Sequence, residues 1–161
     1  MHFLWYVFIL FLISSCSSVH TQAEVYDRQC SALELDAEII RCYNQINSDI
    51  ISRQITVATR RLTDGDWPHS FQMLIQLQVE KTGRFKVQSV LMPSNSRLMD
   101  KKITQVLNGI DEIFVPRNKL FESGGFSQLK LLVKPARTPL LGDEKLIDKG
   151  ALVIYIHKVR R

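Results

Sequence analysis

Residues 71–91, FQMLIQLQVEKTGRFKVQSVL, carry the most regular hydropathy pattern of the chain. Apolar side chains occupy every second position from Phe71 to Val79, which is the periodicity of a strand with one buried face. The segment Lys81-Thr82-Gly83-Arg84 predicts a tight turn, because glycine readily adopts the positive φ that hairpin turns require. Residues 85–91 return as a second strand, so this stretch predicts an antiparallel hairpin.

The sequence after the hairpin predicts a helix and two further strands. Pro93-Ser94-Asn95-Ser96 interrupts the second strand, and a helix is expected to start near Asp100, which we predict as its N-cap. Its inward-facing residues would be Met99, Ile103, Val106, Leu107 and Ile110. A third strand is expected around Leu129, Leu131 and Val133. It should end at Pro135, which has no N–H to donate to a ladder. A fourth strand is expected over Ala151–Ile156.

The sequence before the hairpin predicts helices. Ser31 and Glu34 have the spacing of a capping box, and an apolar stripe follows at helical spacing: Leu35, Ile39, Cys42 and Ile46. Asn47-Ser48-Asp49 is expected to interrupt this helix, with a second helix or a kinked continuation reaching Leu62. The predicted fold class is therefore α+β: N-terminal helices followed by a small, mainly antiparallel sheet with one packed helix.

The cysteines constrain where the first helix begins. In one straight helix, Cys30 and Cys42 would lie roughly 18 Å apart, whereas bridged Cα atoms lie within about 7 Å. A helix capped at Ser31 and a Cys30–Cys42 disulfide therefore exclude each other. Either the helix begins near Asp36 with residues 30–35 folded back, or the two cysteines are not bridged. We favour the bridge, because free thiols are a liability in an oxidising compartment.

The N-terminal residues have the pattern of an export signal. Residues 3–13 are an unbroken apolar run, too short for a membrane-spanning helix of about 20 residues but of the length of a signal-peptide core. Leu12-Ile13-Ser14-Ser15-Cys16 resembles the lipobox of bacterial lipoproteins. The resemblance implies cleavage before Cys16 and acylation of this residue, including palmitate. The alternatives are an ordinary secretory signal and a short buried helix.

This interpretation divides the chain into a signal peptide (1–15), a tether (16–29) and a periplasmic α+β domain (30–161). Ser17 and Ser18 follow Cys16, with no aspartate at the second position, and in enteric-type lipoprotein sorting this implies the outer membrane, here its periplasmic face. Acylation of Cys16 leaves Cys30 and Cys42 as an even pair. The first charged residue is Glu24, so the whole net charge of +5 belongs to the exported part. With 45% hydrophobic residues, the chain is neither collagen-like nor strongly disordered.

Residues 71–135 resemble the C-terminal domain shared by TonB and TolA proteins. The matching features follow one order along the chain: the hairpin with Gly83, Ser94-Asn95-Ser96, Met99-Asp100, Phe114-Val115-Pro116 and Lys134-Pro135. They stand where the family has Asp-Gly, Ser-Ser-Gly, Leu-Asp, Phe-x-Pro and the end of the third strand. Lys101-Lys102 departs from the small residues usual there, and the fourth strand is additional. The resemblance implies contact with envelope proteins through a sheet edge.

Residues with catalytic or metal-binding chemistry do not cluster in the sequence. None of the four histidines, His2, His20, His69 and His157, sits within a carboxylate or cysteine cluster of metal-ligand spacing, and no catalytic motif is present. The adjacent carboxylates Asp111-Glu112 and Asp143-Glu144 would point apart. We therefore expect no catalytic residue, no cofactor and no metal.

The basic pairs of the sequence are Arg60-Arg61, Lys101-Lys102 and Arg160-Arg161. They predict solvated faces, or contacts with anionic headgroups or an acidic partner. Aromatic residues do not interleave with these pairs, so nucleic acid is not an expected partner.

The function predicted from the sequence is that of a non-enzymatic outer-membrane lipoprotein. Its membrane contact would run through acylated Cys16, and its periplasmic domain would bind one or more envelope proteins by strand addition at a sheet edge. The alternative is a lipoprotein assembly factor of a secretion, conjugation or pilus system. A soluble periplasmic enzyme or ligand carrier would need a buried polar pocket.

Overall fold

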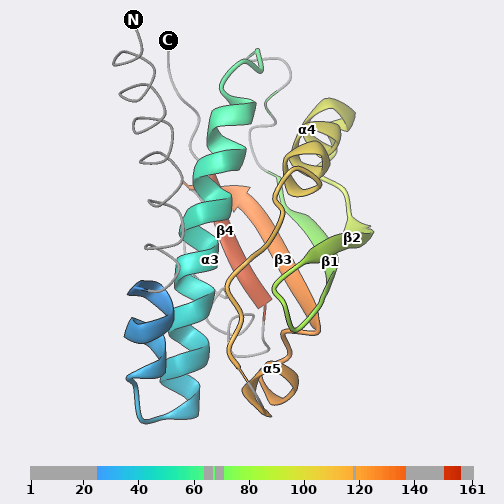
Figure 1. Cartoon of the computed structure of the whole chain (residues 1–161). Coiled ribbons are helices and arrows are strands. Elements are labelled where there is room, and N and C mark those ends of the chain that lie inside the picture. The colour runs from blue at the N-terminus through green and yellow to red at the C-terminus, as the bar shows by residue number, and fades with distance from the viewer. Residues whose placement is uncertain (1–24, 64–66, 68–70, 118, 137–150, 157–161) are drawn as a thin grey trace, which may run out of the picture.

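A computed structural model describes residues 25–63, 67, 71–117, 119–136 and 151–156 of the chain. Its elements are, in order, α3 (Asp36–Thr59), β1 (Met73–Val79), β2 (Phe85–Met92), α4 (Arg97–Leu107), α5 (Lys119–Ser123), β3 (Gln128–Pro135) and β4 (Ala151–Ile156). Residues 25–31 form a further helical segment before α3. The predicted α+β class is confirmed, with helices on the N-terminal side and a four-stranded sheet after them (Figure 1).

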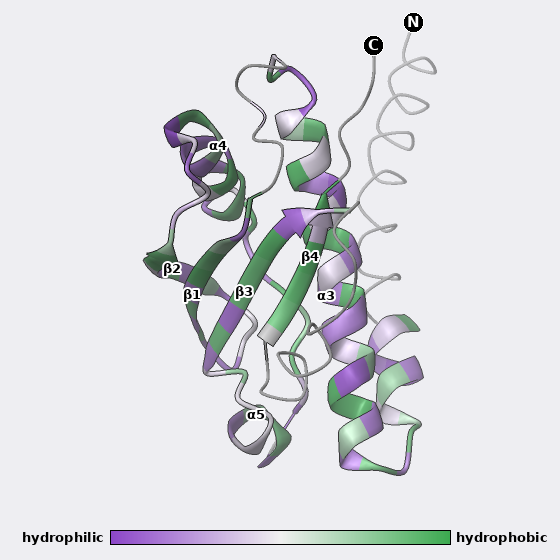
Figure 2. Ribbon diagram, turned by 180° about the vertical axis from the view of Figure 1, so that it is seen from behind, coloured by the Kyte–Doolittle hydropathy of each residue, from purple (hydrophilic) through white to green (hydrophobic). Residues whose placement is uncertain are grey.

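The sheet has the strand order β2-β1-β3-β4. β1 pairs antiparallel with both β2 and β3, as the hairpin pattern predicts, whereas β4 pairs parallel with β3. Ile75 lies opposite Leu131, and Leu131 is in register with Leu152, so apolar residues of neighbouring strands share one face. Helices α3 and α4 cover this face, and the opposite face is turned to the viewer in Figure 2.

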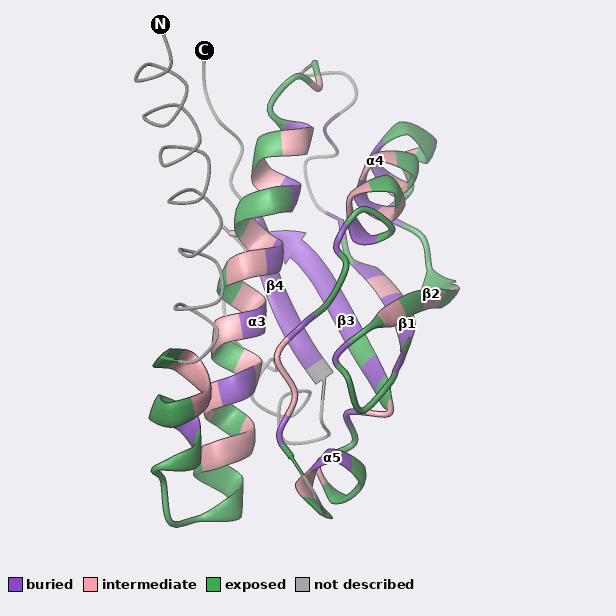
Figure 3. Cartoon of the chain, in the orientation of Figure 1, coloured by how far each residue is buried: buried purple, intermediate pink, exposed green. Residues whose placement is uncertain are grey.

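The core lies between this sheet face and the two helices. It includes fully buried side chains from both layers: Ile51, Ile55, Met73, Ile75, Leu77, Met99, Ile103, Leu107, Leu129 and Leu131. Burial is uneven across the sheet. Every residue of β3 from Leu131 onward is buried, including Lys134, whereas β2 has no buried residue (Figure 3). The sheet is therefore buried on its β3 side and exposed on its β2 side.

Helix α3 is a single helix of 24 residues, so the predicted interruption at Asn47-Ser48-Asp49 is wrong. Its buried residues recur every fourth position: Tyr43, Asn47, Ile51, Ile55 and Thr59. The Asn47 side chain spans the buried interface and bonds the backbone of Phe114 twice. Its Nδ2 donates to the Phe114 carbonyl at 2.7 Å, and its Oδ1 accepts from the Phe114 N–H at 2.8 Å. Asn47, whose polarity suggested a break in the helix, is thus a buried core residue with a hydrogen-bonded side-chain amide.

The start of α3 also differs from the capping-box pattern. The Ser31 hydroxyl lies at the end of the preceding helical segment, where it donates to the carbonyls of Asp27 and Arg28. Helix α3 begins at Asp36, and Leu35 in the N-cap position provides no side-chain cap. The predicted capping box is therefore wrong. Residues between the two helices turn back instead, which is the arrangement that the disulfide alternative required.

Helix α4 is capped by Ser96 and not by the predicted Asp100. The Ser96 Oγ accepts from the Met99 N–H at 3.3 Å, while the Asp100 carboxylate accepts from the Ser94 N–H at 2.9 Å. The serine supplies the cap one residue before the helix, and the aspartate closes the preceding loop from inside the helix. Met99, Ile103 and Leu107 are buried as predicted.

The turn of the hairpin packs against the segment that follows α4. Gly83 has a φ of +88°, and its carbonyl accepts from the Ile113 N–H at 2.9 Å. A Cβ at this position would lie 2.2 Å from the Ile113 carbonyl oxygen. Glycine is therefore required at residue 83 for two reasons: the backbone has a positive φ, and a second backbone segment lies too close for a Cβ.

The substitution Gly83→Ala tests this contact, with Gly125→Ala as the matched control. Gly125 also has a positive φ, +74°, but a Cβ there would meet nothing within 4 Å. We expect G125A to cost about 1 kcal/mol from backbone strain alone, and G83A about 3 kcal/mol because a backbone segment must also shift. Urea denaturation measures both costs. Equal costs for the two variants would contradict the Gly83–Ile113 contact.

Candidate interaction surface

The β4 edge of the sheet is closed by side chains of α3. The Ser48 hydroxyl donates to the Val153 carbonyl at 2.7 Å, and the Ser52 hydroxyl donates to the Tyr155 carbonyl. The two serines lie one helical turn apart, and the two carbonyls lie two residues apart on a strand. The spacing of the two serines along the helix and the spacing of the two carbonyls along the strand are both roughly 6 Å, so each hydroxyl lies beside one carbonyl. Helix α3 therefore occupies acceptors that β4 would otherwise offer to another strand.

The β2 edge at the opposite side of the sheet is open over most of its length. An isolated antiparallel bridge between Arg84 and Glu112 lies just before the first residue of β2. From Lys86 to Met92, no other segment within the described residues pairs with the outer side of the strand. This part of the backbone is consequently available to an additional strand.

Two irregularities in β2 change which way its side chains face. Val90 pairs with Ile75 and Met92 with Leu74, which leaves Leu91 outside the register. A similar shift leaves out Gln88. Such bulges bend a strand and redirect its side chains. As a result Val90, Leu91 and Met92 are all exposed, by 40%, 48% and 38%, although they are consecutive apolar residues (Figures 2 and 3).

Basic residues lie on both sides of this apolar run in the sequence. Between residues 84 and 107 the chain has five basic residues and one acidic residue, a local net charge of +4. The one acid, Asp100, accepts the Ser94 N–H. The basic residues are Arg84, Lys86, Arg97, Lys101 and Lys102. The ion pairs found in the described parts of the chain, Lys81–Glu122 and Arg117–Asp27, include none of the five.

Leu98 adds a fourth exposed apolar side chain, at the start of α4. It shares the outward side of this helix with the exposed Arg97 and Lys101, because the buried positions of α4 are 99, 103 and 107. We define the β2–α4 surface by its apolar and basic residues together: Lys86, Val90, Leu91, Met92, Arg97, Leu98 and Lys101. It combines an open strand edge, exposed apolar area and uncompensated positive charge.

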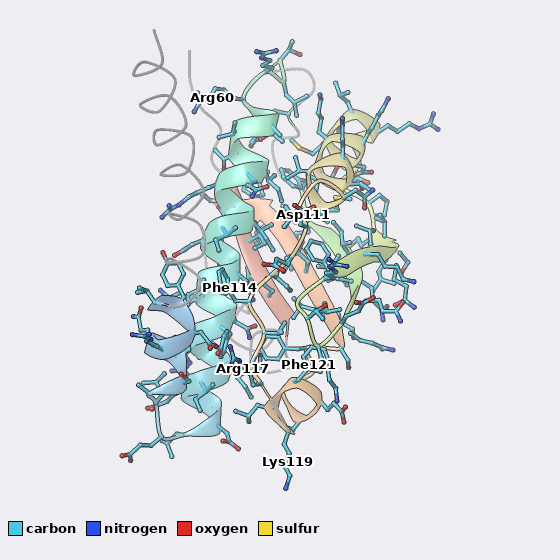
Figure 4. The ribbon with its side chains drawn as sticks, viewed as in Figure 1. Arg60, Asp111, Phe114, Arg117, Lys119 and Phe121 are labelled. Carbon is cyan, nitrogen blue, oxygen red and sulfur yellow. A yellow bond between two sulfur atoms is a disulfide. The ribbon has the colours of Figure 1, made fainter. Side chains whose placement is uncertain are left out.

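A second feature fixes the helical segment 25–31 to the body of the protein. The Cys30 and Cys42 sulfurs are 2.04 Å apart, with Cα atoms 5.5 Å apart, which is disulfide distance. Asp27 joins two further parts of the chain: its Oδ1 accepts from the Tyr43 hydroxyl at 2.6 Å, and its Oδ2 lies 3.1 Å from Arg117 Nη2. Figure 4 shows Phe114 and Arg117 on the segment beside α3. The first five residues of this helical segment belong to the predicted tether.

The Tyr43 hydroxyl is held in its neutral form. Burial raises the pKa of Tyr43 above its ordinary value, and the hydrogen bond to the Asp27 carboxylate raises it further. The tyrosinate would lose hydration and would face a second negative charge. The Tyr43–Asp27 bond therefore stabilises the attachment of the helical segment as long as the tyrosine keeps its proton.

The other predicted site residues are distributed as follows. Cys16, the four histidines, Asp143-Glu144 and Arg160-Arg161 lie outside the described residues. Asp111 and Glu112 are exposed neighbours at the bridge to Arg84. The described residues include no group of three His, Cys, Asp or Glu side chains that could hold a metal ion. None of the described helices has the length and apolar character needed to cross a membrane.

Sequence reasoning missed the residues of α3 that determine which edge stays open. Asn47 and Ser48 were expected in a break of the helix, and Ser52 was assigned no role. The signal that could have placed them is the four-residue spacing of Tyr43, Asn47 and Ile51, which continues across the supposed break. No protein-family model, curated protein or solved structure matches this chain.

Removing the two serine hydroxyls tests whether α3 closes the β4 edge. Ser48→Ala with Ser52→Ala leaves two partly buried carbonyls without their donors, at about 1 kcal/mol or more each. We expect a loss of roughly 2–3 kcal/mol in the free energy of unfolding and faster amide exchange in residues 151–156. The control is Ser89→Ala, on β2, whose hydroxyl bonds no described residue. A double variant as stable as S89A would contradict the closure.

The raised pKa of Tyr43 predicts a pH dependence of stability. The unfolded chain ionises this tyrosine near pH 10, while the folded protein keeps its proton. Stability from this group is therefore complete below about pH 10 and falls as the pH rises further. We expect Tyr43→Phe to lose less stability than the wild type between about pH 9 and 11. Tyr26→Phe is the control, and identical pH profiles for wild type and Y43F would contradict the assignment.

Proposed function

We propose that this chain is a lipid-anchored outer-membrane lipoprotein. Its periplasmic domain binds another envelope protein and catalyses no reaction. The single observation that carries the interaction part of this proposal is the contrast between the two sheet edges. α3 closes the β4 edge with serine hydroxyls, whereas among the described residues nothing pairs with the outer side of β2 from Lys86 to Met92, next to exposed apolar residues.

The anchor is supported by the sequence around Cys16 and by the distribution of cysteines. Leu12-Ile13-Ser14-Ser15-Cys16 has the lipobox pattern, and Ser17 and Ser18 follow it. Cys30 and Cys42 are at disulfide distance, so each of them has the other as its partner. In an oxidising compartment, acylation gives Cys16 a role that leaves no reactive thiol in the mature protein.

This proposal uses the resemblance to the TonB and TolA C-terminal domain, and the structure of β3, β4 and α3 decides which sheet edge a partner would contact. The expected order of hairpin, helix and third strand is supported by the neighbouring strands β2, β1 and β3 and by α4, which follows β2 and precedes β3 along the chain. In this chain β4 pairs with β3, and α3 bonds β4, so a partner strand cannot add beside β3 without displacing both. We therefore place the contact with an envelope protein at β2.

The substitution Cys16→Ala tests the anchor. In cells, C16A should leave the membrane fraction for the soluble periplasmic fraction, because the acyl chains are its attachment to the bilayer. The double variant Cys30→Ala with Cys42→Ala is the control and should remain in the membrane fraction. Mass spectrometry of the wild-type protein should find lipid on an N-terminal Cys16. A C16A protein that stays with the membrane, or a mature protein that begins at Met1, would contradict the proposal.

A further inference from the structure

We infer that the β2–α4 surface binds an extended peptide segment of a partner protein that combines acidic and apolar side chains. The segment would run along β2 as a fifth strand of the sheet. This inference rests on the proposed interaction role and adds the place of contact and the chemistry of the partner.

The backbone of β2 indicates an extended partner. Residues 86–92 have their outer side unpaired within the described residues, and an added strand satisfies such groups by main-chain hydrogen bonds. A lipid surface cannot supply a regular row of donors and acceptors along a strand. The open backbone therefore favours a polypeptide over anionic lipid.

The side chains of the surface indicate the partner's composition. Exposed Val90, Leu91 and Met92 form a consecutive apolar run at the end of β2, which apolar side chains of the partner would cover. Lys86 lies on the same strand, and Arg97 and Lys101 lie one turn apart on the exposed side of α4. Carboxylates on the partner would neutralise this local excess of positive charge.

The position of the surface also favours a protein partner. β2 and β4 lie at opposite ends of the strand order, and α3, with the helical segment 25–31 beside it, lies at the β4 end (Figures 1 and 2). The described chain begins at that segment, whose first five residues are the end of the predicted tether. The β2 edge is thus turned away from the side where the tether joins the domain.

Peptide binding to the mature acylated protein, held in nanodiscs of zwitterionic lipid, tests the inference. The probe is a fluorescent peptide of about eight residues, long enough to run along β2, in which glutamate and valine alternate. Its counterpart has lysine in place of glutamate. We expect the acidic peptide to bind and the basic one to bind at least about tenfold more weakly. Equal binding of both peptides would overturn the charge assignment.

Variants locate the binding site. Leu91→Asp should weaken binding about tenfold, while Val57→Asp, at a site on α3 that is 61% exposed, should leave it unchanged. Arg97→Glu with Lys101→Glu should weaken binding about fivefold, while Arg41→Glu with Arg53→Glu on α3 should not. Circular dichroism should show all four proteins folded, because the substituted residues are exposed. Equal effects of the surface variants and their controls would overturn the inference.

Methylation of alternate backbone nitrogens in the peptide tests strand addition itself. Amides of a strand point alternately to its two sides, so one methylated set should abolish binding and the other should not. Two sets with equal effect would contradict the fifth strand. Binding to vesicles that contain phosphatidylglycerol, without binding to the peptide, would assign the surface to lipid and overturn the inference.

Photo-crosslinking in cells separates this inference from the proposed function. A crosslinker at Leu91 should give an adduct that maps to an acidic, apolar segment of an envelope protein, and one at Val57 should not. Adducts from Val57 alone would leave the interaction role standing and contradict the β2–α4 surface. Adducts from neither position would contradict both.

Discussion

Two serine hydroxyls on α3 determine which edge of this sheet can meet another molecule. Ser48 and Ser52 donate to carbonyls of β4, so the last strand is bonded to β3 on one side and to a helix on the other. Small sheets with an unprotected edge tend to pair with other chains, and covering that edge is one way to prevent such pairing. Because this edge is covered and no segment in the described part of the chain pairs with the outer side of β2 after Arg84, β2 is where the sheet can be extended.

The same helix also fixes the segment after α4. Asn47 bonds both backbone groups of Phe114, and Arg117 on this segment reaches Asp27, which holds Tyr43. Burial of an amide side chain is costly unless its donors and acceptors are hydrogen-bonded, so these contacts favour one position of α3 relative to the segment after α4. The disulfide between Cys30 and Cys42 then fixes the helical segment 25–31 to α3. The predicted tether therefore joins the domain at a rigid point on the side away from β2.

The sequence predicted the elements whose pattern is local and missed those that depend on distant partners. The alternation from Phe71 to Val79 places β1, and Met99, Ile103 and Leu107 place the buried side of α4. Asn47 suggested a break because its partner, Phe114, lies 67 residues away and leaves no trace in the local pattern. Ser96 and Asp100 are both good capping residues, and only the loop geometry decides between them. The open edge could not be predicted, because it depends on strand order, on the bulges in β2 and on the helix beside β4.

The predicted tether joins the domain on one side, and the basic and apolar β2 edge lies on the other. Hydrogen exchange tests this arrangement most directly, in the mature lipidated protein within native membranes and after purification into nanodiscs. We predict that residues 85–92 exchange more slowly in native membranes, where the partner is present, and that residues 151–156 exchange at the same rate in both. Protection that appears in residues 151–156, or in neither strand, would contradict the account.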